Sequence, residues 1–178
     1  MSSTKASADN MPRSPIVSSA HLAAGEAPSL SEVEFGLIVA GHSFSRWMVQ
    51  CMAAAGYPDL SPIEILILHT VRHRSKPKRL ANICLVLHIE DTHLVTYAIR
   101  KLEQAKLVKT GRVGKEKTVS ATDLGVAACM SYAEIREKLL VKSVNHSGIS
   151  GDSLSDLAGF LRVLSGYYDQ SSRSAATL

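Results

Sequence analysis

Aromatic residues and cysteines are scarce in this chain of 178 residues. Phe, Trp and Tyr together make up 5% of it, so we expect a mainly aliphatic core and too few stacking rings for a single-stranded nucleic-acid binder. The three cysteines, Cys51, Cys84 and Cys129, are odd in number and far apart. This pattern excludes a disulfide scaffold and a four-thiolate zinc site, and it is typical of a reducing compartment.

Long apolar runs are also missing. The longest, around Ile63 to Leu68, is far too short to span a bilayer. The first 31 residues lack the charged and apolar regions of a signal peptide. We therefore expect no export, no membrane association and a cytoplasmic location. Hydrophobic residues still make up 46% of the chain, which is enough for the core of one domain with a helical appendage.

Motifs of the common enzymes are absent as well. The chain has no Gly-rich phosphate loop, no Gly-x-Ser-x-Gly elbow and no His-Glu-x-x-His pattern, so we expect neither an enzyme nor a cofactor. His69 and His73 stand four residues apart, a spacing that can bring two imidazoles to one metal ion. Because no third ligand is fixed by spacing, we expect a half-buried His69 beside an exposed, phosphate-facing His73 instead of a metal site.

The cysteines raise the hypothesis that the protein senses oxidants through a thiol. A reactive thiol needs nearby positive charge or a helix N-terminus to lower its pKa. Cys51 stands late in an apolar helical stripe, which favours an inert core cysteine, and we interpret Cys84 and Cys129 in the same way.

Positive charge is concentrated in the middle of the chain. The whole chain has a formal net charge of +4, but residues 72–117 hold twelve Lys and Arg against four acidic residues, a net +8. The rest of the chain is therefore acidic on balance. This distribution predicts a basic module that faces a polyanion, although a solvated basic surface without a partner is the alternative.

Start and stop signals divide the chain into five parts. Residues 1–30 are rich in Ser, Ala and Pro, and we expect a disordered tail. The others are an N-terminal helix within 31–60, with Ser31 and Glu34 at capping-box spacing, a compact region at 61–122, C-terminal helices at 123–170 and a frayed tail at 171–178. Ser61, Pro62 and Glu64 have the positions expected at a helix start.

Region 61–122 has the element order of a winged helix-turn-helix. Two short helices, a turn, a longer helix at about 91–105 and a basic hairpin at about 107–121 follow one another. We expect Asp91 or Thr92 to cap the longer helix, and Thr122 with Asp123 to cap the helix after the hairpin. The inward stripe of the longer helix is Val95, Ala98, Ile99 and Leu102, and the loop of the hairpin is Gly111 to Lys115. The fold class predicted is α+β, mainly α. A helix fits the major groove of B-DNA, and a basic hairpin suits the backbone or the minor groove beside it. The expected DNA contacts are Arg79, Thr92, His93, Thr96, Tyr97, Arg100, Lys101, Arg112, Lys115 and Lys117.

Two sequence stretches carry a family resemblance. Leu102-Glu103-Gln104-Ala105-Lys106-Leu107-Val108, followed by Val119-Ser120-Ala121-Thr122-Asp123-Leu124-Gly125, resembles the MarR family of winged-helix transcription regulators. Leu80-Ala81-Asn82-Ile83 and Ile89-Glu90-Asp91-Thr92-His93-Leu94-Val95 resemble a little-characterised branch of that family. The resemblance implies a homodimer with intertwined terminal helices, two recognition helices on a palindromic operator in double-stranded DNA, and a pocket for a small-molecule effector.

Three positions depart from the family pattern. Lys106 stands where the family usually has Gly, and a left-handed Lys costs about 1 kcal/mol, so we expect the corner to be shaped differently. Tyr97 stands where Arg is common. Val113-Gly114-Lys115 replaces the Asp-x-Arg wing signature, and a lysine lacks the planar fork of arginine. We therefore expect DNA binding without the family's usual wing contact.

A leucine seam supports the dimer independently. Leu154, Leu157, Leu161, Leu164 and Tyr168 step by three and four residues, which is an a/d pattern over two heptads. Two alternatives remain: the last helix folds back on its own domain, or the winged helix binds only protein partners. The basic centre argues against a protein-only module. Operator, target genes, activation or repression, and the effector are not encoded in any residue pattern.

Overall fold

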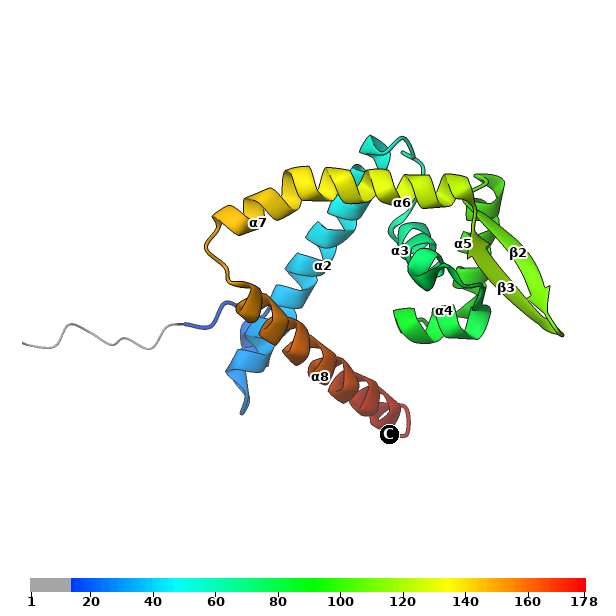
Figure 1. The fold of residues 1–178 in the computed structure, drawn as a ribbon. Helices are drawn as coiled ribbons and strands as arrows, with labels where there is room; N and C mark the ends of the chain where they lie inside the picture. Colours follow the sequence, from blue (N-terminus) through cyan, green and yellow to red (C-terminus); the bar gives the residue numbers. More distant parts are fainter. Residues whose placement is uncertain (1–13) are drawn as a thin grey trace, which may run out of the picture. The chain divides into compact units, whose positions relative to one another are not determined.

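The computed structural model describes residues 14–178. The chain divides after Gln50 into two compact units, and each is considered separately. In the first unit, α1 (Ala20–Ala23) precedes α2 (Pro28–Ala54), whose last residues enter the second unit. The second unit contains every other element and the basic region 72–117 (Figure 1).

The first unit corrects the expected start of the N-terminal helix. Residues 1–13 of the expected tail lie outside the described residues, but 14–30 include α1 and the beginning of α2. Ser31 is therefore not a helix cap. It lies inside α2, is buried, and its hydroxyl donates a 2.7 Å hydrogen bond to the carbonyl oxygen of Leu22. This tertiary contact with α1 leaves no signal in local sequence spacing.

The second unit is built around three packed helices and a small sheet. These are α3 (Pro62–Arg72), α4 (Leu80–Leu87) and α5 (Thr92–Gln104), with β2 (Val108–Val113) and β3 (Glu116–Ala121) as the hairpin. A 3₁₀ turn at His73–Ser75 and a two-residue strand β1 (Lys78–Arg79) join α3 to α4. The antiparallel strand order is β1-β3-β2, and Arg79 pairs with Thr118. Strand β1 was not predicted, because two residues are too few to show the alternation of a strand.

Local capping signals are confirmed at three helix starts. Ser61 and Glu64 form the capping box of α3, with Pro62 as its first residue. At α5 the cap is Asp91, whose carboxylate accepts the backbone N–H of His93 at 2.8 Å. Thr122 caps α6 (Asp123–Arg136) by accepting the N–H of Gly125 at 3.0 Å. Each cap satisfies backbone donors that a helix start leaves without partners.

The core of the second unit is aliphatic, as predicted. The inward stripe of α5, Val95, Ala98, Ile99 and Leu102, is buried throughout. Other fully buried aliphatic side chains of this unit are Ile65, Ile67, Leu68, Val71, Ile83, Leu107 and Val108. Since this stripe holds one face of α5 inside, the opposite face is presented to solvent.

After the hairpin the chain is helical almost to its end. A π-helical turn at Glu137–Val141 links α6 to α7 (Lys142–His146), and α8 (Gly151–Ala175) follows. The expected frayed tail 171–178 is therefore helical through Ala175. Among residues 14–178, no helix combines the length and apolar character that crossing a bilayer requires.

Candidate nucleic-acid interface

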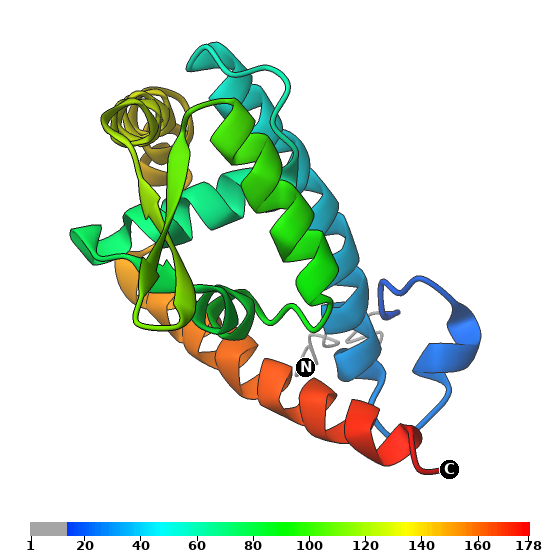
Figure 2. The same ribbon diagram turned by 90° about the vertical axis from the view of Figure 1, so that its right-hand side faces the viewer.

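Helix α5 lies beside the β2–β3 hairpin (Figure 2). Its outward face carries polar side chains. Thr92, His93 and Arg100 are exposed, and the ring of Tyr97 is 62% exposed. Thr96 is half-buried, and its hydroxyl donates to the carbonyl oxygen of Thr92 at 2.8 Å. Its proton is thus used inside the helix, so any contact by Thr96 must use its methyl group or an oxygen lone pair.

Lys101 differs from the other expected contacts. Its ammonium group lies 2.9 Å from the carboxylate of Glu64, whose side chain is only 2% exposed. The hydrogen bond that Lys101 donates to Glu64, and the negative charge of Glu64, raise the pKa of Lys101 above its usual value. The sequence pointed to Glu64 as a capping residue, but not to this pair, because the two residues are far apart along the chain.

The hairpin projects as a basic wing. Arg112, Lys115 and Lys117 are exposed on its two strands and their turn. The turn is only Gly114 and Lys115, and Gly114 has a φ of +63°, which a glycine adopts without strain. Gly111, Arg112 and Val113 belong to β2, although the sequence suggested a loop there.

Two acidic side chains fix the wing to its surroundings. Glu103 on α5 accepts both the N–H and the hydroxyl of Thr110, at 3.2 and 2.6 Å. Glu116 on β3 pairs with Arg79 at 2.7 Å, with both side chains about half exposed. Arg79 is therefore partly neutralised by its own wing.

A small hollow of about 140 Å³ lies between α5 and the wing. Its lining residues are Leu80, Thr96, Ile99, Arg100, Glu103, Thr110, Lys117 and Val119.

The corner after α5 is left-handed despite its lysine, so the expectation of a different shape is wrong. Lys106 has a φ of +59°, and the N–H of Leu107 donates to the carbonyl oxygen of Leu102 at 2.9 Å. This is the hydrogen-bond pattern in which a helix usually ends on glycine. The buried residues Leu102 and Leu107 on each side fix the corner, and the chain tolerates the strain at Lys106.

Replacing Lys106 by glycine is expected to stabilise the protein by up to about 1.5 kcal/mol. Relief of the left-handed strain gains about 1–2 kcal/mol, and the greater freedom of glycine in the unfolded chain removes about 0.4–1 kcal/mol of it. Urea unfolding measures the difference as a higher midpoint at an unchanged slope. Lys109→Gly, in β2, is the control and should destabilise the protein. A lower unfolding midpoint for both variants would contradict backbone strain at Lys106.

A larger hollow lies on the other side of the unit, between α3 and α4. It measures about 510 Å³ and is lined by His69, Thr70, His73, Lys78, Asn82, Leu85 and Val86. The side chains of Leu85 and Val86 are 75% and 64% exposed, so its wall is largely apolar. All its lining residues lie within residues 69–86, and the fold of this stretch from α3 to α4 forms the hollow.

His69 is half-buried in the wall of this hollow, as expected, and His73 is exposed. The ring of His69 meets the ring of Tyr132 edge-on, with centroids 4.7 Å apart. Burial, assisted by the guanidinium of Arg72, lowers the pKa of His69, so this imidazole is neutral at pH 7. In the described part of the chain, no three His, Cys, Asp or Glu side chains gather as a metal site would need.

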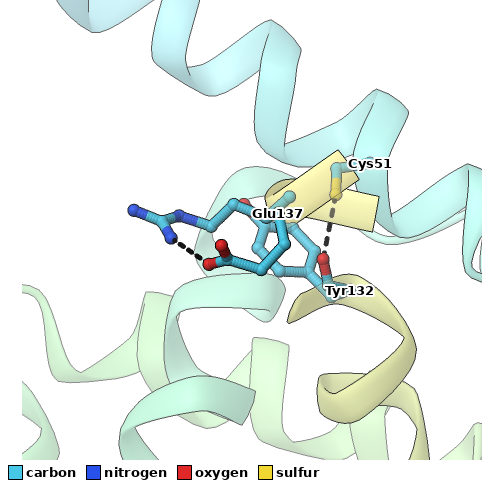
Figure 3. A network of polar contacts seen from close by, with 4 residues as sticks. Cys51, Tyr132 and Glu137 are labelled. Carbon is cyan, nitrogen blue, oxygen red and sulfur yellow. Dashed lines mark hydrogen bonds and ion pairs between the residues drawn. The ribbon is translucent and has the colours of Figure 1, made fainter. Parts of the chain in front are cut away.

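All three cysteines are buried thiols. The Sγ atom of Cys51 donates to the carbonyl oxygen of Tyr132 at 3.5 Å, next to the Arg136–Glu137 ion pair (Figure 3). Burial raises the pKa of Cys51 and raises that of Cys129 to about 11. Raised pKa values leave little thiolate at neutral pH, which favours the interpretation of these two residues as core cysteines.

The leucine seam of α8 is largely exposed in the single chain. Leu154, Leu157, Leu161 and Tyr168 are between 37% and 53% exposed, and Leu164 is half-buried. Phe160, Val163 and Tyr167, which the heptad pattern did not include, are exposed as well, at 58–68%. The apolar surface of α8 is therefore wider than the predicted stripe.

Comparison with known sequences identifies the central region. Residues 60–125 match a family model described as a winged helix DNA-binding domain. No curated protein sequence matches the chain.

Comparison with solved structures extends over most of the chain. A MarR-family transcriptional regulator from Rhodococcus sp. RHA1 is similar with a TM-score of 0.62 and 15% identity, over 79% of this chain and 96% of that one. CouR from Rhodococcus jostii RHA1 bound to p-coumaroyl-CoA has a TM-score of 0.60 and 14% identity, over 74% and 90%. A mutant of MarR from E. coli complexed with operator DNA has a TM-score of 0.63 and 13% identity, over 79% and 99%. The fold is that of MarR-family structures.

Proposed function

We propose, from the winged-helix fold that this chain shares with MarR-family structures, that it is a dimeric, sequence-specific DNA-binding transcription regulator. One observation carries the proposal: the exposed polar face of α5 lies beside a basic wing on a domain of the winged-helix type. A related fold, that of the E. coli MarR mutant, is seen with operator DNA. A bacterial-type regulator of this kind acts in the cytoplasm, where its DNA is.

In the proposed complex, α5 lies in the major groove. Thr92, His93 and Tyr97 then face base edges, since they are exposed on the side opposite the buried stripe. Arg100, Arg112, Lys115 and Lys117 face phosphates, with Lys115 at the wing turn nearest the flanking minor groove. Arg79 contributes less than a free arginine, because Glu116 pairs with it.

The proposed dimer forms through α8 and brings two copies of α5 to a palindromic operator. The exposed apolar side chains of α8 suit burial against a second copy of the chain. However, the two heptads of the α8 seam are too short to form a stable coiled coil by themselves. The interface must therefore include further elements of the partner chain.

A small-molecule effector is part of the proposal. CouR is seen with p-coumaroyl-CoA bound. In this chain the hollow between α3 and α4 has the size and apolar lining of a ligand site, with His73, Lys78 and Asn82 as polar groups. Because α4 packs on both α3 and α5, a ligand that wedges between α3 and α4 has a route to the recognition helix.

The test is fluorescence anisotropy with two labelled duplexes. One is the DNA upstream of the protein's own gene, or a sequence selected by the protein from a random duplex pool, and the other is its scrambled version. Both are titrated at about 50 and 200 mM salt, where phosphate contacts give a steep salt dependence. Preference for the first duplex supports the regulator, whereas no binding at low salt makes a protein-interaction module the better function.

Tyr97→Ala is expected to weaken binding to the selected duplex by about 5- to 100-fold and binding to the scrambled duplex much less. The physical reason is that a side chain 62% exposed at the middle of α5 reaches base edges, and one base contact is worth about 1–3 kcal/mol. The two dissociation constants measured at one salt concentration provide the readout. An equal loss on both duplexes would remove Tyr97 from the base-reading set.

Lys117→Ala is expected to weaken binding to both duplexes alike. Each phosphate contact that is lost lowers the slope of log K against log salt by about one. Lys138→Ala is the matched control, because Lys138 is an equally exposed lysine in the π-helical turn, far along the chain from α5 and the wing. A salt slope unchanged in Lys117→Ala would place the wing outside the interface.

A further inference from the structure

The buried carboxylate of Glu64 joins the start of α3 to the recognition helix. One of its oxygens, Oε2, accepts the backbone N–H of Ser61 at 2.8 Å and completes the cap of α3. The other, Oε1, lies 2.9 Å from the Nζ atom of Lys101. A single side chain therefore holds the first turn of one helix and the last turns of another.

The two partners differ in their exposure. The side chain of Glu64 is 2% exposed, whereas that of Lys101 is 39% exposed. A carboxylate this deeply buried needs a cation, and a lysine that leaves its carboxylate strands a charge. The raised pKa of Lys101 agrees with a cation bound firmly to Glu64. A DNA phosphate that drew Lys101 away would leave the buried carboxylate of Glu64 without its cation.

Arg100, its neighbour on α5, shows the contrast. Arg100 is exposed and lines the hollow beside the wing with Lys117. Successive residues on a helix point about 100° apart, so Arg100 and Lys101 face different surroundings although both are cations of the same turn. One faces the wing side of α5, and the other faces α3.

We propose that Lys101 is a positioning residue for DNA recognition and not a phosphate contact. Its ion pair with Glu64 sets how α5 sits on α3, and thereby where Thr92, His93 and Tyr97 meet the base edges. Arg100 supplies the phosphate contact of this turn. This inference corrects the sequence-based assignment of Lys101 and rests on the proposed function, because it assumes that α5 reads DNA.

Glu64→Gln separates positioning from simple electrostatics. The amide still accepts the N–H of Ser61, but it no longer holds Lys101 through a full negative charge. The variant is more positive by one charge, so electrostatics alone would tighten binding to every duplex. Positioning predicts the opposite for the selected duplex: at least about fivefold weaker binding, the lower end of one base contact, with binding to the scrambled duplex unchanged or tighter.

Lys101→Met and Arg100→Met are a matched pair that each remove one cation. Arg100→Met is expected to lower the salt slope by about one and to weaken both duplexes alike. Lys101→Met is expected to leave the salt slope unchanged and to reduce only the preference for the selected duplex. Lys101→Arg, which keeps a cationic donor for Glu64, is expected to restore most of that preference.

Binding is measured at a temperature where circular dichroism shows each variant to be fully folded. A loss of stability then does not affect the ratio of the dissociation constants for the selected and scrambled duplexes. If Lys101→Met does not fold, Glu64→Gln and Lys101→Arg still decide the question. A salt slope that falls by one in Lys101→Met, or tighter binding of Glu64→Gln to both duplexes, would overturn the positioning role. Failure of the wild-type protein to prefer any duplex would instead overturn the proposed function.

Discussion

Replacing Gly125 by alanine is expected to lower the free energy of unfolding by at least about 3 kcal/mol, the upper end of ordinary overpacking. A Cβ atom at this position would lie 2.0 Å from the carbonyl oxygen of Leu107 and 3.2 Å from the side chain of Leu68. The first contact is with backbone, which cannot move aside as a flexible side chain does. Either α6 or the start of the wing must shift.

Neighbouring hydrogen bonds make this shift more costly. The N–H of Thr122 donates to the same carbonyl oxygen of Leu107 at 3.0 Å, and the hydroxyl of Thr122 donates to the carbonyl oxygen of Lys106 at 2.7 Å. The N–H of Gly125 in turn donates to that hydroxyl. A displaced α6 therefore breaks its own cap as well as its packing on Leu68.

Urea unfolding followed by circular dichroism measures the effect on Gly125→Ala. Gly151→Ala is the matched control, since Gly151 begins α8 and has no atom within 4 Å of an added Cβ. The control is expected to change the free energy of unfolding by less than about 0.5 kcal/mol, as surface substitutions usually do. Equal unfolding midpoints for the two variants would show that α6 and the wing do not approach so closely.

The second large effect is expected on α8. Changing both Leu157 and Leu161 to glutamate should convert the proposed dimer to a monomer and weaken binding to the selected duplex by about 100-fold or more. Two linked half-sites gain about 10²–10⁴ in affinity over one, and a monomer loses that gain. The single chain should still fold, because both leucines are exposed in it, at 53% and 37%.

Sedimentation equilibrium gives the mass of this double variant, and anisotropy gives its affinity. Ser155→Glu is the control, because Ser155 is exposed on α8 next to the seam residue Leu154 but outside the a/d positions. A wild-type monomer would contradict the dimer altogether. A double variant that stays dimeric would move the interface away from the seam, and the exposed side chains of Phe160, Val163 and Tyr167 would then be the next to test.

Local sequence patterns determined most of the element order around the candidate interface. The stripe Val95, Ala98, Ile99 and Leu102 predicted which face of α5 is buried, and all four residues are buried. The helix caps at Ser61 and Thr122 could also be predicted from the sequence, because a cap joins residues only two or three positions apart. The hairpin was predicted from two short runs with a glycine between them, though its loop is shorter than expected.

The partners of the expected contact residues follow from tertiary contacts. Arg79 pairs with Glu116, Lys101 with Glu64, and the hydroxyl of Thr96 turns back to its own helix. A list of basic and polar residues gives no information about these partners, since the two ion pairs join residues 37 positions apart in the chain. The same limit applies to β1, whose residues Lys78 and Arg79 pair with Val119 and Thr118 of β3.

At Lys106, one part of the conformation could be predicted from the sequence and another part could not. Sequence alone identified it as a poor choice for a left-handed corner, because a Cβ atom clashes with the backbone there. Whether the corner would keep its shape depended on Leu102 and Leu107, which are buried on either side and joined by a backbone hydrogen bond. Sequence thus indicated which backbone conformations are strained and which faces are apolar. The left-handed corner persists because the packing that buries Leu102 and Leu107 offsets the strain at Lys106.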